Sequence, residues 1–213
     1  MIEPRIVLTS RSGLIYRIRE GQGEYPYTVL MLHGLGGDEN SMWVLEHALP
    51  SGMSIVAPRA LFPIGERNFS WVDNTLRGWP TKEDFLPAVE ALKRLINELE
   101  NEIGLVQDDL MLMGFSQGAA LAFATADDPA ISPKAVIAAA TFLPVGDFTN
   151  LGGLPIFWGH GVRDEWISIE RARRDSQTLK DVGAQIHFCE TDVGHKMGVE
   201  CLNGLQEWIE RLE

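Results

Sequence analysis

Residues 114–118 read Gly-Phe-Ser-Gln-Gly, and this pentapeptide constrains the fold more than any other segment of the chain. The apolar run before it is typical of a buried strand, and the alanine-rich run after it favours a helix. A serine on so sharp a strand–turn–helix junction needs small residues two positions before and after it, because larger side chains collide where the helix crosses the strand. Gly114 and Gly118 meet this requirement. The pattern predicts that Ser116 is a nucleophile with free backbone N–H groups beside it.

Strand-like and helix-like segments alternate along the chain, which predicts an α/β fold, a mostly parallel central sheet with helices on both faces. Apolar runs typical of buried strands occupy residues 28–32, 54–57, 109–113, 134–139, 154–158 and 184–189, and residues 14–19 alternate like a half-exposed strand. Apolar residues at helical spacing predict helices over residues 84–103, 169–182 and 202–212, the first with Asp84 as its N-cap. Since no internal repeat or long polar linker interrupts the pattern, residues 1–213 are expected to form a single domain.

The composition narrows the classes of partner. A net charge of −12 argues against nucleic acid or an anionic membrane surface as the main partner. The longest nearly apolar run, residues 135–145, is shorter than the ~20 residues that a membrane span requires, so stable membrane insertion is not expected. The N-terminal residues do not combine a basic region with a following apolar stretch, so a signal peptide is not expected.

The chain has two cysteines, Cys189 in a predicted strand and Cys201 in a predicted helix. Their spacing is not that of a metal site, and we interpret them as buried free thiols. Free thiols are typical of a reducing compartment, so the sequence predicts a cytoplasmic location.

A serine hydroxyl is a weak nucleophile near neutral pH, so Ser116 needs a base and a group that orients the base. Among the five histidines, His195 lies between the final strand and the final helix, which gives the chain order Ser…Asp…His. The acid is expected on a loop after a strand between these two residues. Asp164 follows residues 154–158, and its carboxylate would accept the Nδ1 proton of the histidine. Asp147, after the preceding strand, is the alternative.

An oxyanion site is expected beside the nucleophile. Residues 33–37 read His-Gly-Leu-Gly-Gly and follow the strand at 28–32. Glycine-rich backbone at this place can present an N–H group toward the serine turn, so we assign the N–H groups of Leu35 and Gln117 to the oxyanion hole. The segment lacks the Lys-Ser/Thr ending of a phosphate loop and the glycine spacing of a dinucleotide site.

With these motifs in this order, the chain resembles the phospholipase/carboxylesterase group of α/β-hydrolases, which includes bacterial carboxylesterases and acyl-protein thioesterases. The matching segments are residues 33–39, 57–60, 114–118, 160–164 and 194–195. The resemblance implies the α/β-hydrolase fold, a Ser116–Asp164–His195 triad in preference to Asp147, a cofactor-free ester or thioester hydrolase, and frequently a homodimer. Two segments depart from the group. Glu165-Trp166-Ile167 stands where Pro-x-Val is common, and Ala140-Thr141 stands where Ser-Gly is often found.

The sequence therefore predicts a serine esterase that cleaves small carboxylic esters with short to medium acyl chains through an acyl-enzyme. A thioesterase or lysophospholipase is the alternative within the same family, and a binding protein that keeps the fold without turnover is the alternative of another class. Residues 58–80 form a long segment without clean periodicity, and a loop of that length is usually functional. Apolar side chains on the strand-end loops are expected to form the substrate pocket, namely Trp71, Phe142, Leu143 and Trp166.

Overall fold

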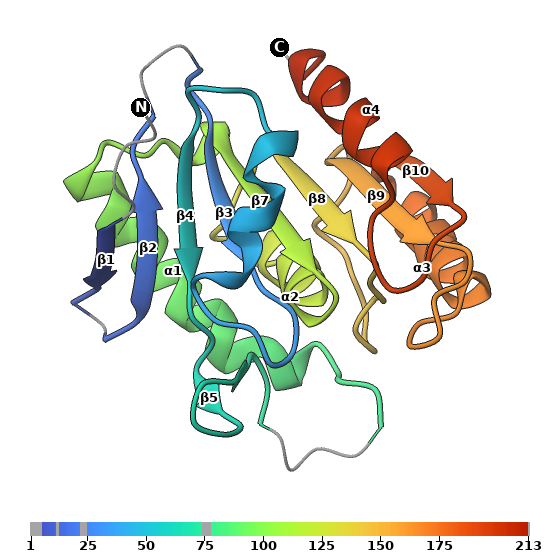
Figure 1. The fold of residues 1–213 in the computed structure, drawn as a ribbon, viewed down its shortest axis with the longest axis horizontal. Coiled ribbons are helices and arrows are strands. Elements are labelled where there is room, and N and C mark those ends of the chain that lie inside the picture. Colours follow the sequence, from blue (N-terminus) through green and yellow to red (C-terminus); the bar gives the residue numbers. More distant parts are fainter. Residues whose placement is uncertain (1–5, 12, 22–24, 74–77, 213) are drawn as a thin grey trace.

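A computed structural model describes residues 6–11, 13–21, 25–73 and 78–212 of the protein (Figure 1). Its centre is an eight-stranded sheet in the order β1-β2-β4-β3-β7-β8-β9-β10. The strands are β1 Ile6–Thr9, β2 Ile15–Arg19, β3 Thr28–Leu32, β4 Ser54–Pro58, β7 Leu110–Phe115, β8 Ala135–Ala139, β9 Pro155–Gly161 and β10 Gln185–Thr191. All neighbouring pairs from β4 to β10 are parallel, and β2 runs antiparallel to both β1 and β4. The predicted mostly parallel sheet is confirmed.

Helices cover both faces of the sheet, as predicted. One face carries α1 Leu86–Glu102, α2 Gln117–Ala126 and α3 Ile169–Asp181, and the other carries the 3-10 helix η1 Ser41–Ala48 and α4 Val199–Glu210 (Figure 1). Short 3-10 turns η2 Glu83–Phe85 and η3 Gln107–Asp109 precede α1 and β7. Each face has its own hydrophobic cluster, because the central strands bury the side chains that point to either side.

The helix ends differ in part from the sequence prediction. The helix expected over residues 169–182 is α3, and Ser168 caps it because its side chain accepts the N–H of Arg171. The prediction of Asp84 as N-cap was wrong, since α1 begins only after η2 and the Asp84 carboxylate instead accepts hydrogen bonds from the N–H and hydroxyl of Thr81. Sequence periodicity shows the buried face of a helix but not a preceding 3-10 turn of similar pattern.

Two further elements were missed. Strand β1 pairs with β2 at the edge of the sheet, and residues 58–80 contain a small hairpin of β5 Phe62–Pro63 and β6 Phe69–Ser70. Residues 74–77 of that segment lie outside the described residues, as do parts of the proposed single domain over residues 1–213, so the domain assignment stays a prediction. Within the described part of the chain, no helix is long and apolar enough to cross a membrane.

The cysteine prediction was wrong, because Cys189 and Cys201 form a disulfide. Cys189 lies in β10 and Cys201 in the first turn of α4, which packs against that strand. Their Cα atoms are 5.8 Å apart, a separation that a disulfide spans without backbone movement. The contact joins two elements across twelve positions of sequence, and local periodicity carries no information about it. A disulfide between the two cysteines removes the basis for predicting a reducing compartment from free thiols.

Candidate active site

The proposed nucleophile lies on the turn between β7 and α2. Ser116 has φ 51° and ψ −118°, a conformation that non-glycine residues rarely adopt and that marks functional sites. A Cβ atom on Gly118 would lie 2.1 Å from the carbonyl oxygen of Leu32, and one on Gly114 would lie 2.3 Å from the backbone nitrogen of Ala119. Both glycines are therefore needed where α2 passes across the strands, which is the physical basis of the sequence pattern.

The structure brings Asp164 and His195 together. Nδ1 of His195 lies 2.7 Å from Oδ2 of Asp164, so the ring donates its Nδ1 proton and keeps Nε2 free to accept one. The other carboxylate oxygen accepts the backbone N–H groups of Trp166 and Ile167 at 2.9 and 3.0 Å. Asp164 is only 7% exposed, so these hydrogen bonds to its carboxylate take the place of hydrogen bonds to water. The alternative acid, Asp147, is exposed on the loop after β8.

The loops that carry Asp164 and His195 are held against each other by backbone hydrogen bonds. The N–H of Val162 donates to Thr191 O and that of Arg163 donates to Val193 O, at 2.8 and 2.9 Å. A Cβ atom on Gly161 would lie 2.1 Å from Gly194 O, so only glycine allows this approach. The imidazole of His195 also packs on the ring of the residue before the nucleophile, with ring centroids 5.0 Å apart. His195 therefore packs against the end of β7, next to the turn that carries Ser116.

The glycine-rich loop after β3 is anchored by a buried histidine. Nε2 of His33 accepts the N–H of Ala60 at 3.0 Å, and Nδ1 donates to Gly34 O at 2.7 Å. Burial lowers the pKa of His33, which keeps the ring neutral and this pattern of one donor and one acceptor intact. A Cβ atom on Gly37 would lie 2.7 Å from the ring, so the chain can fold over the histidine only with glycine there. The His33 ring thus fixes the backbone of the loop that carries Leu35.

Gln117, the second proposed oxyanion residue, connects the serine turn to the segment after β6. Its side-chain Oε1 accepts the N–H of Trp71 at 2.9 Å, and its Nε2 donates to Ser70 Oγ at 3.1 Å. As the first residue of α2 it has a backbone N–H without a partner inside the helix, which suits an oxyanion.

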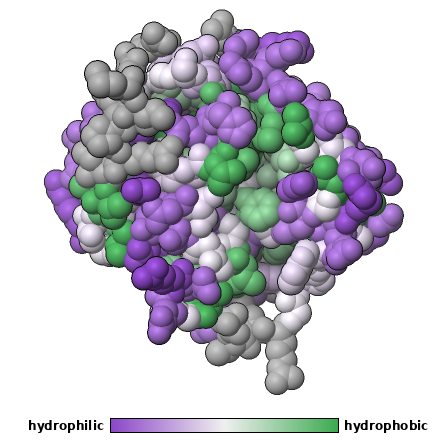
Figure 2. Space-filling view, viewed as in Figure 1, coloured by the Kyte–Doolittle hydropathy of each residue, from purple (hydrophilic) through white to green (hydrophobic). Residues whose placement is uncertain are grey.

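Two cavities lie beside the loop that carries His195. One, of about 400 Å³, lies between the glycine-rich loop, η1 and the segment after His195, and it is lined mainly by apolar side chains, among them Leu35, Met42, Val44, Leu45, Phe115 and Met197. Figure 2 views the molecule from the same side as Figure 1, and it shows hydrophobic residues around a hollow near the middle, with hydrophilic residues around them. The other cavity, of about 320 Å³, is lined by Arg163, Glu165, Trp166, Gly194 and His195 and is more polar.

Three of the four predicted pocket residues, Trp71, Phe142 and Leu143, belong to the same buried hydrophobic cluster, and Trp166 does not. Trp71 is fully buried and donates its indole N–H to His33 O at 2.7 Å, and Phe142 and Leu143 are buried in the cluster beneath α1 and α2. Trp166 is 79% exposed and lines the polar cavity, with its ring centroid 6.4 Å from that of His195. The residues of η1 that line the apolar cavity were missed. Their signal was available in the sequence, because an apolar run follows the glycine-rich loop within a few residues.

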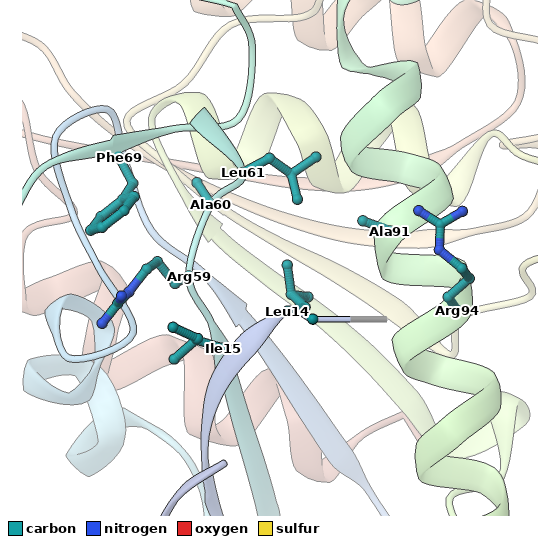
Figure 3. A pocket seen from close by; sticks show the side chains of 9 residues that line it. Leu14, Ile15, Arg59, Ala60, Leu61, Phe69, Ala91 and Arg94 are labelled. Atoms are coloured by element: carbon teal, nitrogen blue, oxygen red, sulfur yellow. The ribbon is translucent and has the colours of Figure 1, made fainter. Parts of the chain in front are cut away.

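A further cavity of about 250 Å³ lies between β2, the end of β4 and α1 (Figure 3). Arg59 and Arg94 lie on opposite sides of it, with Leu14 between them. The guanidinium of Arg59 is already engaged with the Glu39 carboxylate at 2.6 and 2.8 Å, which lowers the pKa of that carboxyl. We therefore assign no chemistry to this cavity. In the described residues, no group of three or more His, Cys, Asp or Glu side chains is placed to hold a metal ion.

Comparison with known proteins identifies the fold and the family of the chain. The fold is that of the α/β-hydrolases, and the structure superposes on the crystal structure of a carboxylesterase from Mesorhizobium loti with a TM-score of 0.86, covering 98% of this chain and 99% of that one at 22% identity. Residues 15–213 match the phospholipase/carboxylesterase family, and the chain belongs to that family.

The relatives point to the same class of enzyme. The chain is 26% identical over 208 residues to acyl-protein thioesterase 1 of Yarrowia lipolytica, across 86% of this chain and 90% of that protein. It is 30% identical over 179 residues to acyl-protein thioesterase 1 of Debaryomyces hansenii, across 73% and 77% of the two chains. The protein is a carboxylesterase-type hydrolase.

Proposed function

We propose that the protein hydrolyses neutral carboxylic esters with short to medium acyl chains, using Ser116 as the nucleophile. The observation that carries the proposal is the 2.7 Å hydrogen bond between Asp164 and His195, on a loop that packs against the serine turn. This bond leaves Nε2 of His195 as the free acceptor on the imidazole, which is the state that a general base requires.

The reaction proceeds in two halves. Nε2 of His195 takes the hydroxyl proton as Ser116 Oγ attacks the acyl carbon, and Asp164 stabilises the imidazolium that forms. The N–H groups of Leu35 and Gln117 bind the tetrahedral oxyanion, where one such donor can contribute ~3–4 kcal/mol to the transition state. The imidazolium then gives its proton to the leaving alcohol. Water, deprotonated by the same imidazole, then attacks the acyl-enzyme. As the bond between the acyl carbon and Ser116 Oγ breaks and the acid is released, the imidazolium returns the proton to Oγ.

The two cavities accommodate different parts of the substrate. The alcohol must lie against His195 to receive its proton, and the polar cavity beside Trp166 includes that histidine. The acyl chain then occupies the apolar cavity between the glycine-rich loop and η1. Each methylene that finds apolar cover there contributes ~0.8 kcal/mol, so kcat/KM is expected to rise over the first few carbons and then level off as the cavity fills.

The test is a series of p-nitrophenyl esters from acetate to octanoate with wild type and two variants. Val44 is 68% exposed and lines the apolar cavity, whereas Val199 is 66% exposed and does not line it. Val44→Trp should lower kcat/KM for butanoate and octanoate while leaving acetate nearly unchanged, and the matched variant Val199→Trp should change none of them. Equal loss at every chain length, or no turnover by wild type, would contradict the proposal. Absence of turnover would favour a binding protein that retains the fold.

Thioester hydrolysis is the second candidate, because the relatives from both yeasts carry the name acyl-protein thioesterase. The same acyl group presented as an oxygen ester and as a thioester separates the two, and a lysophospholipid added to the panel tests the third activity of the family. Two other predictions remain open to experiment. A homodimer is tested by sedimentation at several protein concentrations, and the cytoplasmic location by cell fractionation.

A further inference from the structure

Thr141 lies next to the turn that carries Ser116. It follows β8, the strand next to β7 (Figure 1), and it is fully buried. Its hydroxyl donates to the backbone carbonyl of Ser116 at 2.7 Å, with a second, longer contact of 3.3 Å to Phe142 O. The same carbonyl accepts N–H groups from the first turn of α2 at 3.0 and 3.1 Å. The threonine bond is the shortest of these, and it is the one that comes from outside the helix.

The Ser116 carbonyl and the Gln117 N–H belong to one peptide unit. The unit is planar, and the described residues contain no cis peptide bond, so the N–H points away from the carbonyl in the same plane. A bond that fixes the carbonyl therefore also fixes the direction of the N–H at the other end. Accepting a hydrogen bond at the oxygen further polarises the unit, which makes the N–H a stronger donor.

The segment 139–141 holds Ser116 from both sides. The N–H of Ser116 donates to Ala139 O at 2.9 Å, while its carbonyl accepts the Thr141 hydroxyl. Between them, Ala140 has φ 46°, a left-handed conformation that alanine adopts only at a cost and that turns the chain here. Backbone strain is thus present on both partners of this contact, at Ser116 and at Ala140.

We propose that Thr141 is a positioning residue for the oxyanion hole, which aims the Gln117 N–H through the shared peptide unit. The inference rests on the proposed function, since it requires an oxyanion beside Ser116. The oxyanion forms only in the transition state, so loss of the hydroxyl should lower kcat and leave KM nearly unchanged. Removing an oxyanion donor outright costs about 10²–10³-fold in kcat, and misaiming a donor that is still present should cost less, about 10-fold.

The experiment compares Thr141→Val, which keeps the shape without the hydroxyl, with Thr141→Ser, which keeps the hydroxyl. Thr125→Val is the matched control, because Thr125 in α2 is also fully buried and its hydroxyl has no partner among the described residues. We expect an about 10-fold lower kcat for Thr141→Val, near wild-type kcat for the other two, and similar KM values for all. A trifluoromethyl ketone, whose hemiketal oxyanion mimics the intermediate, should bind Thr141→Val more weakly by the same factor.

Unfolding in urea checks that each variant is folded, and Thr141→Ala replaces Thr141→Val if the valine variant is not. The inference is overturned if Thr141→Val matches Thr125→Val in kcat, if Thr141→Ser loses as much as Thr141→Val, or if only KM changes. If wild type neither hydrolyses an ester nor is labelled at Ser116 by a fluorophosphonate, the proposed function fails, and the role of Thr141 fails with it. Active wild type with unchanged Thr141→Val overturns the role of Thr141 alone.

Discussion

Removing the disulfide between Cys189 and Cys201 should destabilise the protein far more than it affects catalysis. The bond closes a loop across twelve positions of sequence, and the chain-entropy cost of closing a loop of about this size corresponds to ~3 kcal/mol at 25 °C. Domains are stable by only about 5–15 kcal/mol, so the double variant Cys189→Ala/Cys201→Ala should lose a large part of its stability.

The loop closed by the disulfide carries His195, which is why catalysis belongs in the same experiment. Other contacts also hold this loop, including the backbone bonds from Val162 to Thr191 O and from Arg163 to Val193 O. The disulfide therefore acts mainly by restricting the unfolded chain, and the folded variant should keep a kcat close to that of wild type.

The assay is urea unfolding with and without a phosphine reductant. Reductant should lower the stability of wild type by the same ~3 kcal/mol and leave the double variant unchanged. Alkylation of the unfolded, unreduced protein should add no label to either cysteine. Two labels per chain without reductant, or a midpoint that does not respond to reductant, would refute the reasoning. A large fall in kcat with normal stability would show instead that the bond shapes the histidine loop.

The remaining predictions concern the triad and the buried histidines. Ser116→Ala should fold normally and lose at least ~10³-fold in kcat, and a fluorophosphonate that labels another residue would contradict the assignment. Asp164→Asn should lose up to ~10⁴-fold through the wrong histidine tautomer while Asp147→Asn loses little, and steady-state kinetics showing the reverse order would assign the acid to the other loop. Burial lowers the pKa of His33 and of His160 below the ordinary 6.5, so unfolding takes up protons as the pH falls. Their contribution to stability is complete above about pH 6.5 and is lost on acidification. The urea midpoint of wild type should therefore fall between about pH 7 and about pH 5, and it should fall less in His33→Gln. An equal fall in the two proteins would contradict this.

The sequence was most informative where the determinant is local. The five residues of the serine turn specify a junction that only small neighbours permit, and the distances from the positions of Gly114 and Gly118 to the backbone show why. Strands β3, β4, β7, β8 and β9 were predicted well because burial on both faces leaves a continuous apolar run that hardly depends on the rest of the fold. Strand β10 was also found, but the expectation that it is buried on both faces was wrong, because most of its residues are exposed or half-buried. The edge strand β1 was missed because it is short and partly exposed, and a strand of that kind carries little pattern.

Contacts between elements that are distant in sequence could not be predicted from local sequence patterns. The pairing of Cys189 with Cys201 depends on how α4 packs on β10, and the apolar cavity depends on where η1 lies over the glycine-rich loop. The side-chain direction of Trp71 could not be predicted from local sequence either. Its sequence context suggested a substrate pocket, but its side chain is fully buried and its indole N–H supports the carbonyl of His33. An aromatic residue on a loop is indicated by sequence, but the direction of its side chain is decided by packing.

The order of strands explains why residues so far apart in the chain can form one site. Strands β3, β7, β8, β9 and β10 are consecutive neighbours in the sheet and all run parallel, so their carboxyl ends share one edge. Each strand is followed by one residue of the proposed site: Leu35 after β3, Ser116 after β7, Thr141 after β8, Asp164 after β9 and His195 after β10. The proposed nucleophile thus lies between the proposed oxyanion loop after β3 and the segment after β8, and the proposed acid and base follow the next two strands. In the proposed mechanism, the proton passes between groups that follow different strands of the same sheet.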